Sequence, residues 1–260
     1  MSLLLHADPG NAQAIWTPEG DPSKLDWTPV DQPLSFTFRW MFSGTPSDWS
    51  NYRYFGGESA SPGNNIIGHI LHGTGTNFYI IFSIYNSSWS EIAKFETTSP
   101  VTLSADTLYH IAVVASSAGN NKIYLNKVSQ SVTDTTWTAN TAIDVAYENI
   151  GYENTSENNY SHYKMWNKAI SQTEIDNDFA NPYQYDSDGN CILSLHFDEN
   201  TGTNANDVQT QFTQTDASLE NGATWGGDPF RHPSVGSLSA SGVIPIQGHG
   251  VVVPTTVYQG

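Results

Sequence analysis

The chain has 260 residues, of which 38% are hydrophobic and 12% aromatic, so a substantial hydrophobic core is possible. Its formal net charge is −17, because 26 acidic residues outnumber the nine lysines and arginines, which are scattered along the sequence. Nucleic acids and anionic membranes are bound through a basic face, so the composition argues against both as partners. No stretch reaches the length of a transmembrane helix.

The chain contains a single cysteine, Cys191, which excludes an intrachain disulfide. We expect Cys191 to be a small core residue, and the core alone must hold the fold together. Residues 1–8 lack the basic region and the apolar length of a signal peptide. We therefore expect synthesis in the cytosol without a conventional export signal.

Alternating apolar and polar residues predict short strands along most of the chain. Residues 34–40 place large apolar side chains on one face and polar side chains on the other, which indicates a central strand. Residues 44–65 are rich in Gly, Ser and Pro, and we interpret them as a loop. Further strands are expected at the start of the chain and at residues 66–71, 78–85, 89–95, 137–152, 192–197 and 217–225.

Residues 109–132 predict an antiparallel hairpin. Ile111, Val113 and Ala115 share one face of its first strand. Residues 119–121 supply the Gly and Asn that a tight turn with positive φ angles requires. We interpret residues 122–128 as the returning strand.

One helix is indicated near residues 171–180. Ser171 and Glu174 have the spacing of a capping box, in which each side chain accepts the other's backbone N–H. Many short strands with a single short helix are typical of an all-β fold, so we predict an antiparallel β-sandwich of the jelly-roll type.

The composition changes after residue 228. Residues 229–260 contain no Asp, Glu or Lys, and Arg231 is their one charged residue. We predict a jelly-roll domain at residues 1–228, followed by an extended, nearly uncharged C-terminal arm at residues 229–260 that lies on a partner.

Three segments together resemble the concanavalin A-like jelly-roll superfamily, which includes laminin G domains, pentraxins and legume lectins. YHIAVV at 109–114 with IYLN at 123–126 resembles its paired strand motifs, and residues 150–151 with 163–175 resemble its strand-and-capped-helix block. HFDE at 196–199, with the residues up to 225, resembles a third block. The resemblance covers roughly residues 1–227 and implies a sandwich fold.

Candidate catalytic carboxylates occur at Glu174, Asp176 and Asp178, which imitate the strand motif of glycosidases in the same superfamily. The three residues lie in the predicted helix, where the 3.6-residue period scatters them, and the terminal Glu of the motif is missing. We therefore predict no catalytic residues.

Two segments suggest calcium. Residues 185–190 begin like a calcium loop, but the twelfth position is Phe197 instead of the required Glu, so a tight turn is the better interpretation. By the habits of the resembled family, Asp198, Glu199 and Asp207 are candidate ligands for a calcium ion (Ca2+). Capping and turn roles are the alternative for these three residues. Ser161 and His162 replace the acidic pair that the family usually carries there.

Four aromatic residues are candidate carbohydrate contacts: Trp49, Tyr52, Tyr54 and Trp89. Aromatic faces stack on the C–H surfaces of sugars, while neighbouring Asn and Asp bind hydroxyls. The alternative is that some of these side chains pack beneath loops.

These observations favour a non-catalytic structural or binding protein on the surface of a virus particle, as a capsid decoration or a tail- or fibre-associated module of a bacteriophage. Its arm would dock on other virion proteins, its loops would contact host glycans, and it would form a homo-oligomer or part of a larger assembly. The alternatives are a free extracellular lectin module that binds carbohydrate and a degenerate glycoside hydrolase. The resemblance gives an analogy of fold, not of function.

Overall fold

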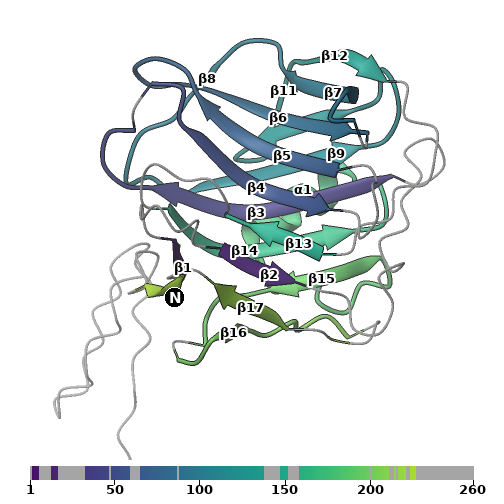
Figure 1. The fold of residues 1–260 in the computed structure, drawn as a ribbon. Coiled ribbons are helices and arrows are strands. Elements are labelled where there is room, and N and C mark those ends of the chain that lie inside the picture. The colour runs from purple at the N-terminus through teal and green to yellow at the C-terminus, as the bar shows by residue number, and fades with distance from the viewer. Residues whose placement is uncertain are drawn as a thin grey trace, which may run out of the picture.

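The computed structural model is a β-sandwich in which two antiparallel sheets pack face to face and one helix covers the outer side of one sheet (Figure 1). The predicted all-β sandwich with one short helix is thereby confirmed. No helix in the described part of the chain has the length and apolarity to cross a membrane. The described residues are 2–5, 13–16, 33–46, 48–58, 65–86, 88–137, 147–151, 158–199, 201–210, 214, 216–220 and 223–226. The predicted arm at 229–260 and the boundary at residue 228 lie outside them.

Sheet A is the 8-stranded sheet, with the order β11-β10-β9-β3-β14-β1-β18 and with β15 also paired to β14. Its strand β3 (Leu34–Phe42) lies between β9 (Tyr109–Ala115) and β14 (Asn158–Trp166). The remaining strands are β1 (Ser2–Leu5), β10 (Lys122–Leu125), β11 (Val128–Gln130), β15 (Cys191–Leu195) and β18 (Thr224–Gly226).

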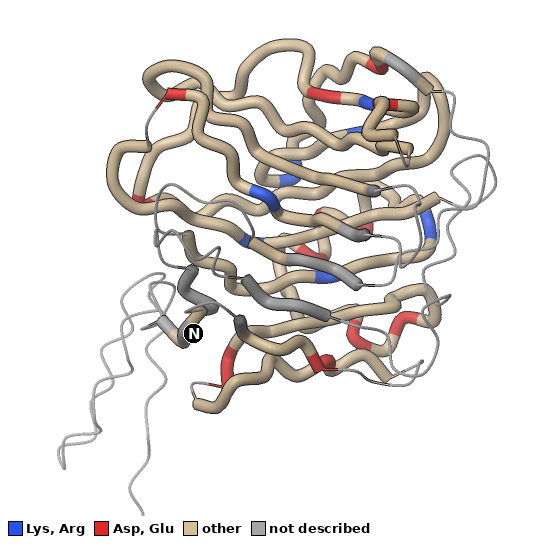
Figure 2. The backbone as a smooth tube through the Cα atoms, in the orientation of Figure 1, with Lys and Arg blue, Asp and Glu red and all other residues tan. Residues whose placement is uncertain are grey.

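Sheet B is the 10-stranded sheet, with the order β12-β7-β6-β5-β4-β13-β2-β17-β16 and with β8 paired to β6. Figure 2 shows lysines and arginines spread over both sheets instead of gathered at one edge. The strands are β2 (Gln13–Trp16), β4 (Asn51–Glu58), β5 (Asn65–His72), β6 (Asn77–Tyr85), β7 (Glu91–Thr97), β8 (Val101–Thr102), β12 (Val132–Trp137), β13 (Tyr147–Ile150), β16 (Asn204–Ala205) and β17 (Ala217–Glu220).

Aromatic rings fill the space between the sheets. Phe36, Phe38 and Trp40 of β3 are at most 1% exposed. The Phe38 ring stacks on Tyr54 of β4 with 4.7 Å between centroids, and the Phe36 ring lies 4.3 Å from that of Phe55. Ring pairs at such separations stabilise by about 0.5–1.5 kcal/mol beyond the burial of their area. The two sheets are therefore joined by ring contacts as well as by hydrophobic burial.

The outer face of sheet A is covered by α1 (Gln172–Ala180). Ile175 of the helix is fully buried, and it belongs to a second apolar cluster with Val114, Trp166 and Cys191. The prediction that Cys191 is a small core residue is confirmed. β3 and β9 are consequently buried on both faces, which is why their sequences carry few charges.

The predicted capping box begins this helix. The Ser171 hydroxyl accepts the Glu174 N–H at 3.3 Å, and the Glu174 carboxylate accepts the Ser171 N–H at 2.7 Å. Both bonds satisfy donors that have no partner within the helix, and they fix its start.

The predicted hairpin is present, with β9 and β10 in antiparallel register and Gly119 at φ +77 in its turn. The returning strand is shorter than predicted, because it ends at Leu125. Asn126 and Lys127 both have positive φ, as a two-residue type I′ turn requires, and they lead directly into β11. The Asn126 side chain accepts the His110 N–H at 2.9 Å, which holds this turn against β9.

The interpretation of residues 44–65 as a loop is wrong for β4. Tyr52, Tyr54 and Phe55 are fully buried and pair their strand with β5 through a bulge between Arg53 and Phe55. The core needs large rings opposite β3, and this need outweighs the high Gly and Ser content of the flanking residues. The strand predicted at 89–95 begins only at residue 91, because residues 88–89 form the preceding turn.

Gly68 of β5 lies directly beneath the Tyr54 ring. A Cβ atom at Gly68 would lie 2.3 Å from Tyr54 Cε2, and the Tyr54 hydroxyl is fixed by donation to the Ile81 carbonyl at 3.0 Å. We expect Gly68→Ala to lower the free energy of unfolding by about 1–3 kcal/mol, as overpacked core sites do. Denaturant unfolding measures this.

The matched control is Gly189→Ala, because a Cβ there meets no atom within 4 Å. An equal effect of the two substitutions would contradict the contact between Gly68 and Tyr54.

Candidate functional site

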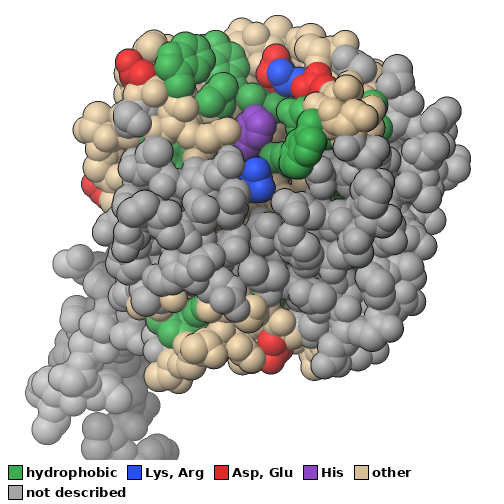
Figure 3. All heavy atoms as spheres, viewed as in Figure 1, with side chains coloured by type: hydrophobic (Ala, Val, Ile, Leu, Met, Phe, Trp, Pro, Cys, Tyr) green, Lys and Arg blue, Asp and Glu red, His purple; other side chains and the backbone are tan. Residues whose placement is uncertain are grey.

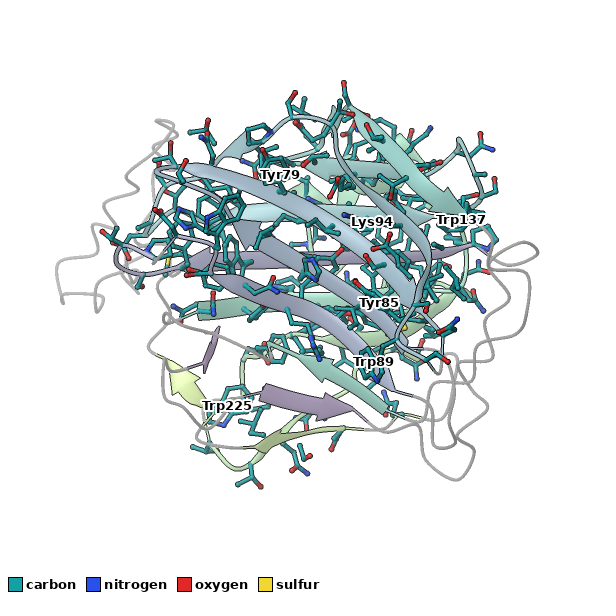
Figure 4. All side chains as sticks on the ribbon, turned by 45° about the horizontal axis from the view of Figure 1, so that its top comes forward. Tyr79, Tyr85, Trp89, Lys94, Trp137 and Trp225 are labelled. Carbon is teal, nitrogen blue, oxygen red and sulfur yellow. The ribbon has the colours of Figure 1, made fainter. Side chains whose placement is uncertain are left out.

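The turn between β6 and β7 carries the best candidate site. Trp89 is 62% exposed, and its ring centroid lies 6.1 Å from that of Tyr85, with the planes inclined at 46°. Ile84 faces the core, so Tyr85 turns to the outer face of sheet B. Figure 4 shows the two rings as neighbours at the end of β6. We call them the Tyr85–Trp89 pair.

The backbone of this turn is held by Asn86. Its side-chain oxygen accepts the N–H groups of Ser88 and Ser90, each at 3.0 Å, and its carbonyl accepts the Trp89 N–H at 2.8 Å. These bonds place Trp89 at φ +58. A left-handed backbone costs roughly 1–2 kcal/mol for a residue other than glycine. Strained residues are often found at functional sites, and Trp89 combines this strain with exposure, whereas Phe197, which also has a positive φ, is buried.

Polar groups lie beside the pair on the same face. Ser88 and Ser90 are exposed in the turn itself. Lys94 of β7 follows along the sheet (Figure 4), with its ammonium 3.0 Å from the Glu96 carboxylate. Hydroxyl, ammonium and carboxylate groups next to an exposed aromatic surface are the elements of a sugar-binding site.

Trp49, like Trp89, is strongly exposed and has a positive φ, but it lies in another turn. It is 64% exposed, its φ is +65, and its N–H donates to the Gly73 carbonyl at 3.3 Å. Gly73 is hydrogen-bonded to Asn77 at the start of β6, whereas Trp89 follows the end of that strand. At about 3.3 Å per residue, the strand separates the two tryptophans by roughly 25–30 Å. Figure 3 shows exposed hydrophobic side chains in several separate groups on the face that it presents.

The prediction that Tyr52 and Tyr54 contact carbohydrate is corrected by their burial. Both side chains are 0% exposed and point between the sheets, where Tyr52 packs on Trp40 at 5.4 Å. A ring in this position has no face open to a sugar. Of the four predicted aromatic residues, Trp49 and Trp89 are therefore the two that reach the surface, at separate sites.

The three predicted calcium ligands do not form a cation site. No group of three His, Cys, Asp or Glu side chains in the described ranges has an arrangement that could hold a metal ion. Asp207 is buried and its carboxylate accepts the Ser194 and Gln209 N–H groups, while Glu199 accepts a backbone N–H and Asp198 is exposed. Asp207 and Glu199 thus fill the alternative role of fixing turns.

The helical carboxylates Glu174, Asp176 and Asp178 point in different directions. Glu174 caps the helix and binds Lys168 at 2.7 Å, and Asp176 accepts from the exposed Gln172 amide. Asp178 is buried, with its carboxylate 3.0 Å from both His110 Nε2 and Lys164 Nζ. Burial raises the pKa of Asp178, but the hydrogen bond from His110 and the Lys164 charge bring the pKa below its ordinary value. The three carboxylates therefore stabilise α1 and its attachment to the sheet.

The segment 185–190 forms the predicted tight turn. The Asp188 carboxylate accepts the Asn190 N–H at 2.8 Å and binds Lys168 at 2.9 Å. This turn leads into β15, whose first residue, Cys191, has its pKa raised to about 12 by burial. A thiol with this pKa is not ionised near neutral pH and is inert as a nucleophile.

The comparisons with known proteins give a likeness of fold. Neither a protein-family model nor a curated protein sequence matches the chain. A heptameric pentraxin from Limulus polyphemus is 11% identical, with 85% of this chain and 93% of that chain covered and a TM-score of 0.52. The fold is the concanavalin A-like jelly roll.

Two toxin structures have the same jelly roll. One is of botulinum neurotoxin type C, which depends on interaction with two ganglioside molecules to enter cells; it is 14% identical, covers 72% of this chain and 43% of that chain, and has a TM-score of 0.50. The other is the binding domain of Paraclostridial Mosquitocidal Protein 1, at 9% identity, 70% and 44% coverage and a TM-score of 0.51. The chain spans less than half of each toxin chain.

The burial of His162 was not predicted from the sequence. Its imidazole lies 5.3 Å from that of His196 and 4.9 Å from the Tyr183 ring. Burial, together with the electrostatic effect of the neighbouring His196, Arg39 and Lys164 side chains, lowers the pKa of His162 to about 2. The folded protein therefore holds this histidine neutral.

This pKa predicts acid sensitivity. Between pH 6.5 and about 2, the unfolded chain binds a proton at His162 that the folded chain does not, so stability falls as the pH falls. The expected loss is about 1.4 kcal/mol per pH unit, or about 2 kcal/mol from pH 6.5 to 5. Unfolding free energies measured by denaturant at several pH values report it.

His162→Asn is the diagnostic variant, because it keeps a group that can bond to Ser161 and removes the titration. It should flatten the pH dependence by about the same 2 kcal/mol, even if it lowers stability at pH 7. Burial also lowers the pKa of His69, to about 4, so His69→Asn should flatten the curve over a narrower range. Identical curves for the wild type and His162→Asn would contradict this assignment.

Proposed function

We propose that this chain is a lectin-like domain that binds glycans without catalysis, and that the Tyr85–Trp89 pair is its principal sugar contact. The support comes from the exposed aromatic faces on a rigid sheet, with hydroxyl and charged groups beside them. The similar neurotoxin type C structure, whose protein depends on gangliosides, adds support at the level of the fold. This function corresponds to the lectin alternative of the sequence interpretation.

One observation carries the proposal: Trp89 is 62% exposed and has a φ of +58. Gly or Asn would satisfy this turn without strain, and a polar residue would avoid exposing a large apolar ring to water. The tryptophan therefore costs folding stability and adds little packing. A ligand that stacks on its indole ring gives a physical reason for this cost, as is common for strained residues in binding sites.

The virion role stays a prediction. It depends on residues 229–260, which lie outside the described residues, and none of the similar structures named above is a virion protein. The glycan-binding role and a virion location are compatible, since the proposed contact lies on the jelly roll itself.

Substitution of Trp89 tests the glycan-binding proposal. On an array of animal and bacterial glycans, we expect the wild type to bind a defined subset, and Trp89→Gly to weaken that binding at least about tenfold, as the loss of a central aromatic contact does. Tyr85→Ala should weaken it less, because Tyr85 is the more buried ring of the pair. Glycan titrations measured by calorimetry give the affinities.

Trp49→Gly is the matched control, since it removes an equally exposed tryptophan with a positive φ at the other end of β6. Both glycine variants should fold, because glycine relieves the left-handed strain. Binding that survives Trp89→Gly but not Trp49→Gly would move the site to Trp49. Binding that survives both, or an absence of glycan binding by the wild type, would overturn the proposal.

A further inference from the structure

The outer face of β6 carries a tyrosine toward each of its ends. The even-numbered residues of the strand from 78 to 84 belong to the core, so Tyr79 and Tyr85 both point to the outer face of sheet B. Figure 4 shows the two tyrosines well separated along the sheet. They are six residues apart, which is about 20 Å in an extended strand. We call this face of β6, with the turns at its two ends, the β6 strip.

Each of the two tyrosines has an exposed tryptophan beside it. Tyr85 forms the pair with Trp89. At the other end, a Cβ atom at Gly73 would lie 3.6 Å from Tyr79 Cε2, and the Gly73 carbonyl accepts the Trp49 N–H at 3.3 Å. Gly73 therefore lies between the Tyr79 ring and the backbone of Trp49. The β6 strip thus carries the same combination twice, a strand tyrosine and a turn tryptophan.

Polar side chains flank the strip between its two ends. The outward residues Ile81 and Ser83 are at most 4% exposed, so they add little surface of their own. On β7, Glu96 lies opposite Ile81 and Lys94 lies opposite Ser83, with 3.0 Å between the carboxylate and the ammonium. On β5, His69 lies opposite Ile81. The middle of the strip therefore offers groups that can bind sugar hydroxyls.

A short glycan on the Tyr85–Trp89 pair would leave Trp49 without a role. Trp49 is as exposed as Trp89 and also has a positive φ, so it too costs folding stability. A ligand that reaches both tryptophans gives one physical reason for both costs.

We propose that the ligand of the β6 strip is a linear polysaccharide that stacks on Trp89 at one end and on Trp49 at the other. This proposal rests on the glycan-binding function proposed above and specifies its ligand class. The chain must span roughly 25–30 Å in a straight line along β6. Extended, β-linked chains of the cellulose, xylan or chitin type have this shape, whereas the α-linked chain of amylose coils.

The two ends of the strip act together on such a chain. Once a sugar unit is stacked on one tryptophan, contact with the other tryptophan is intramolecular. Linked contacts of this kind raise the affinity by about 100- to 10,000-fold over either contact alone, provided that the chain is long enough to reach both. The affinity should therefore rise steeply with the length of the chain.

A length series tests this proposal. Cello-, xylo- and chito-oligosaccharides, each as the disaccharide and the hexasaccharide, are titrated into the intact protein by calorimetry, with malto-oligosaccharides as the coiled control. We expect at least one of the three extended hexasaccharides to bind on the order of 100-fold more tightly than its disaccharide, and maltohexaose to show no such gain.

Two outcomes of the series would overturn the proposal. The first is equal affinity of the disaccharide and the hexasaccharide, which would leave glycan binding at Trp89 in place. The second is that none of the extended hexasaccharides binds, whatever the glycan array shows. The ligand class and the glycan-binding function can therefore fail separately.

Two variants connect the gain to the named residues. Trp49→Gly should reduce the affinity for the hexasaccharide to that for the disaccharide, which reaches only Trp89 and for which this variant remains the control used above. Val128→Ser is the matched control for the hexasaccharide, because it removes a side chain that is 61% exposed from β11 at the edge of the other sheet. A gain that survives Trp49→Gly, or one that is lost in Val128→Ser, would contradict the proposal.

Discussion

The position of the Tyr54 ring governs how the two sheets meet. The ring stacks on Phe38 of sheet A, covers Gly68 of its own sheet, and is anchored through its hydroxyl to the Ile81 carbonyl. A hydroxyl that is buried between sheets must be bonded, so one hydrogen bond fixes the ring and the ring fixes the spacing. Burial accordingly raises the pKa of Tyr54 well above its ordinary value. The inward-facing side chains of β4, β5 and β6 are thus used for packing between the two sheets.

The use of these side chains for packing determines where groups that could bind a ligand occur. Aromatic side chains that face inward, such as Tyr52 and Phe55, have no surface left for a ligand. The exposed tryptophans lie instead in turns: Trp89 follows the end of β6, and Trp49 precedes β4 and is hydrogen-bonded to Gly73 near the start of β6. Rigid strands position these turns, and the turns carry the chemistry, which is the usual division of roles in β-sandwiches.

The fold could be predicted from the sequence because period-two alternation and the capping box are local signals. β3, β6 and the β9–β10 hairpin are clear examples. β4 was missed although Tyr52 and Tyr54 alternate with Arg53, because the flanking Gly and Ser residues carry the stronger local signal for a loop. The exposure of Trp49 and Trp89 could not be deduced, since it depends on which way each turn bends; the surrounding Ser and Asn residues were the only signal.

The contacts between α1 and sheet A could not be predicted at all from spacing. Arg39 and Phe179 are 140 residues apart, and His110 and Asp178 are 68 apart. Only the register of β3 with β9 and the placement of α1 bring them together. A shift of one residue in this register would put the Arg39 and His110 side chains on opposite faces of the sheet.

The strand order of sheet A also has a consequence for biosynthesis. β1, the first strand, pairs with β14 and β18, near residues 160 and 225. At about 5–20 residues per second, a ribosome needs on the order of 10–45 s to make the chain from β1 to β18. β1 has neither partner until β14 is made, and its other edge then stays open until β18 is made. Sheet A is therefore completed late, because its strand β1 must wait for partners that are synthesised much later.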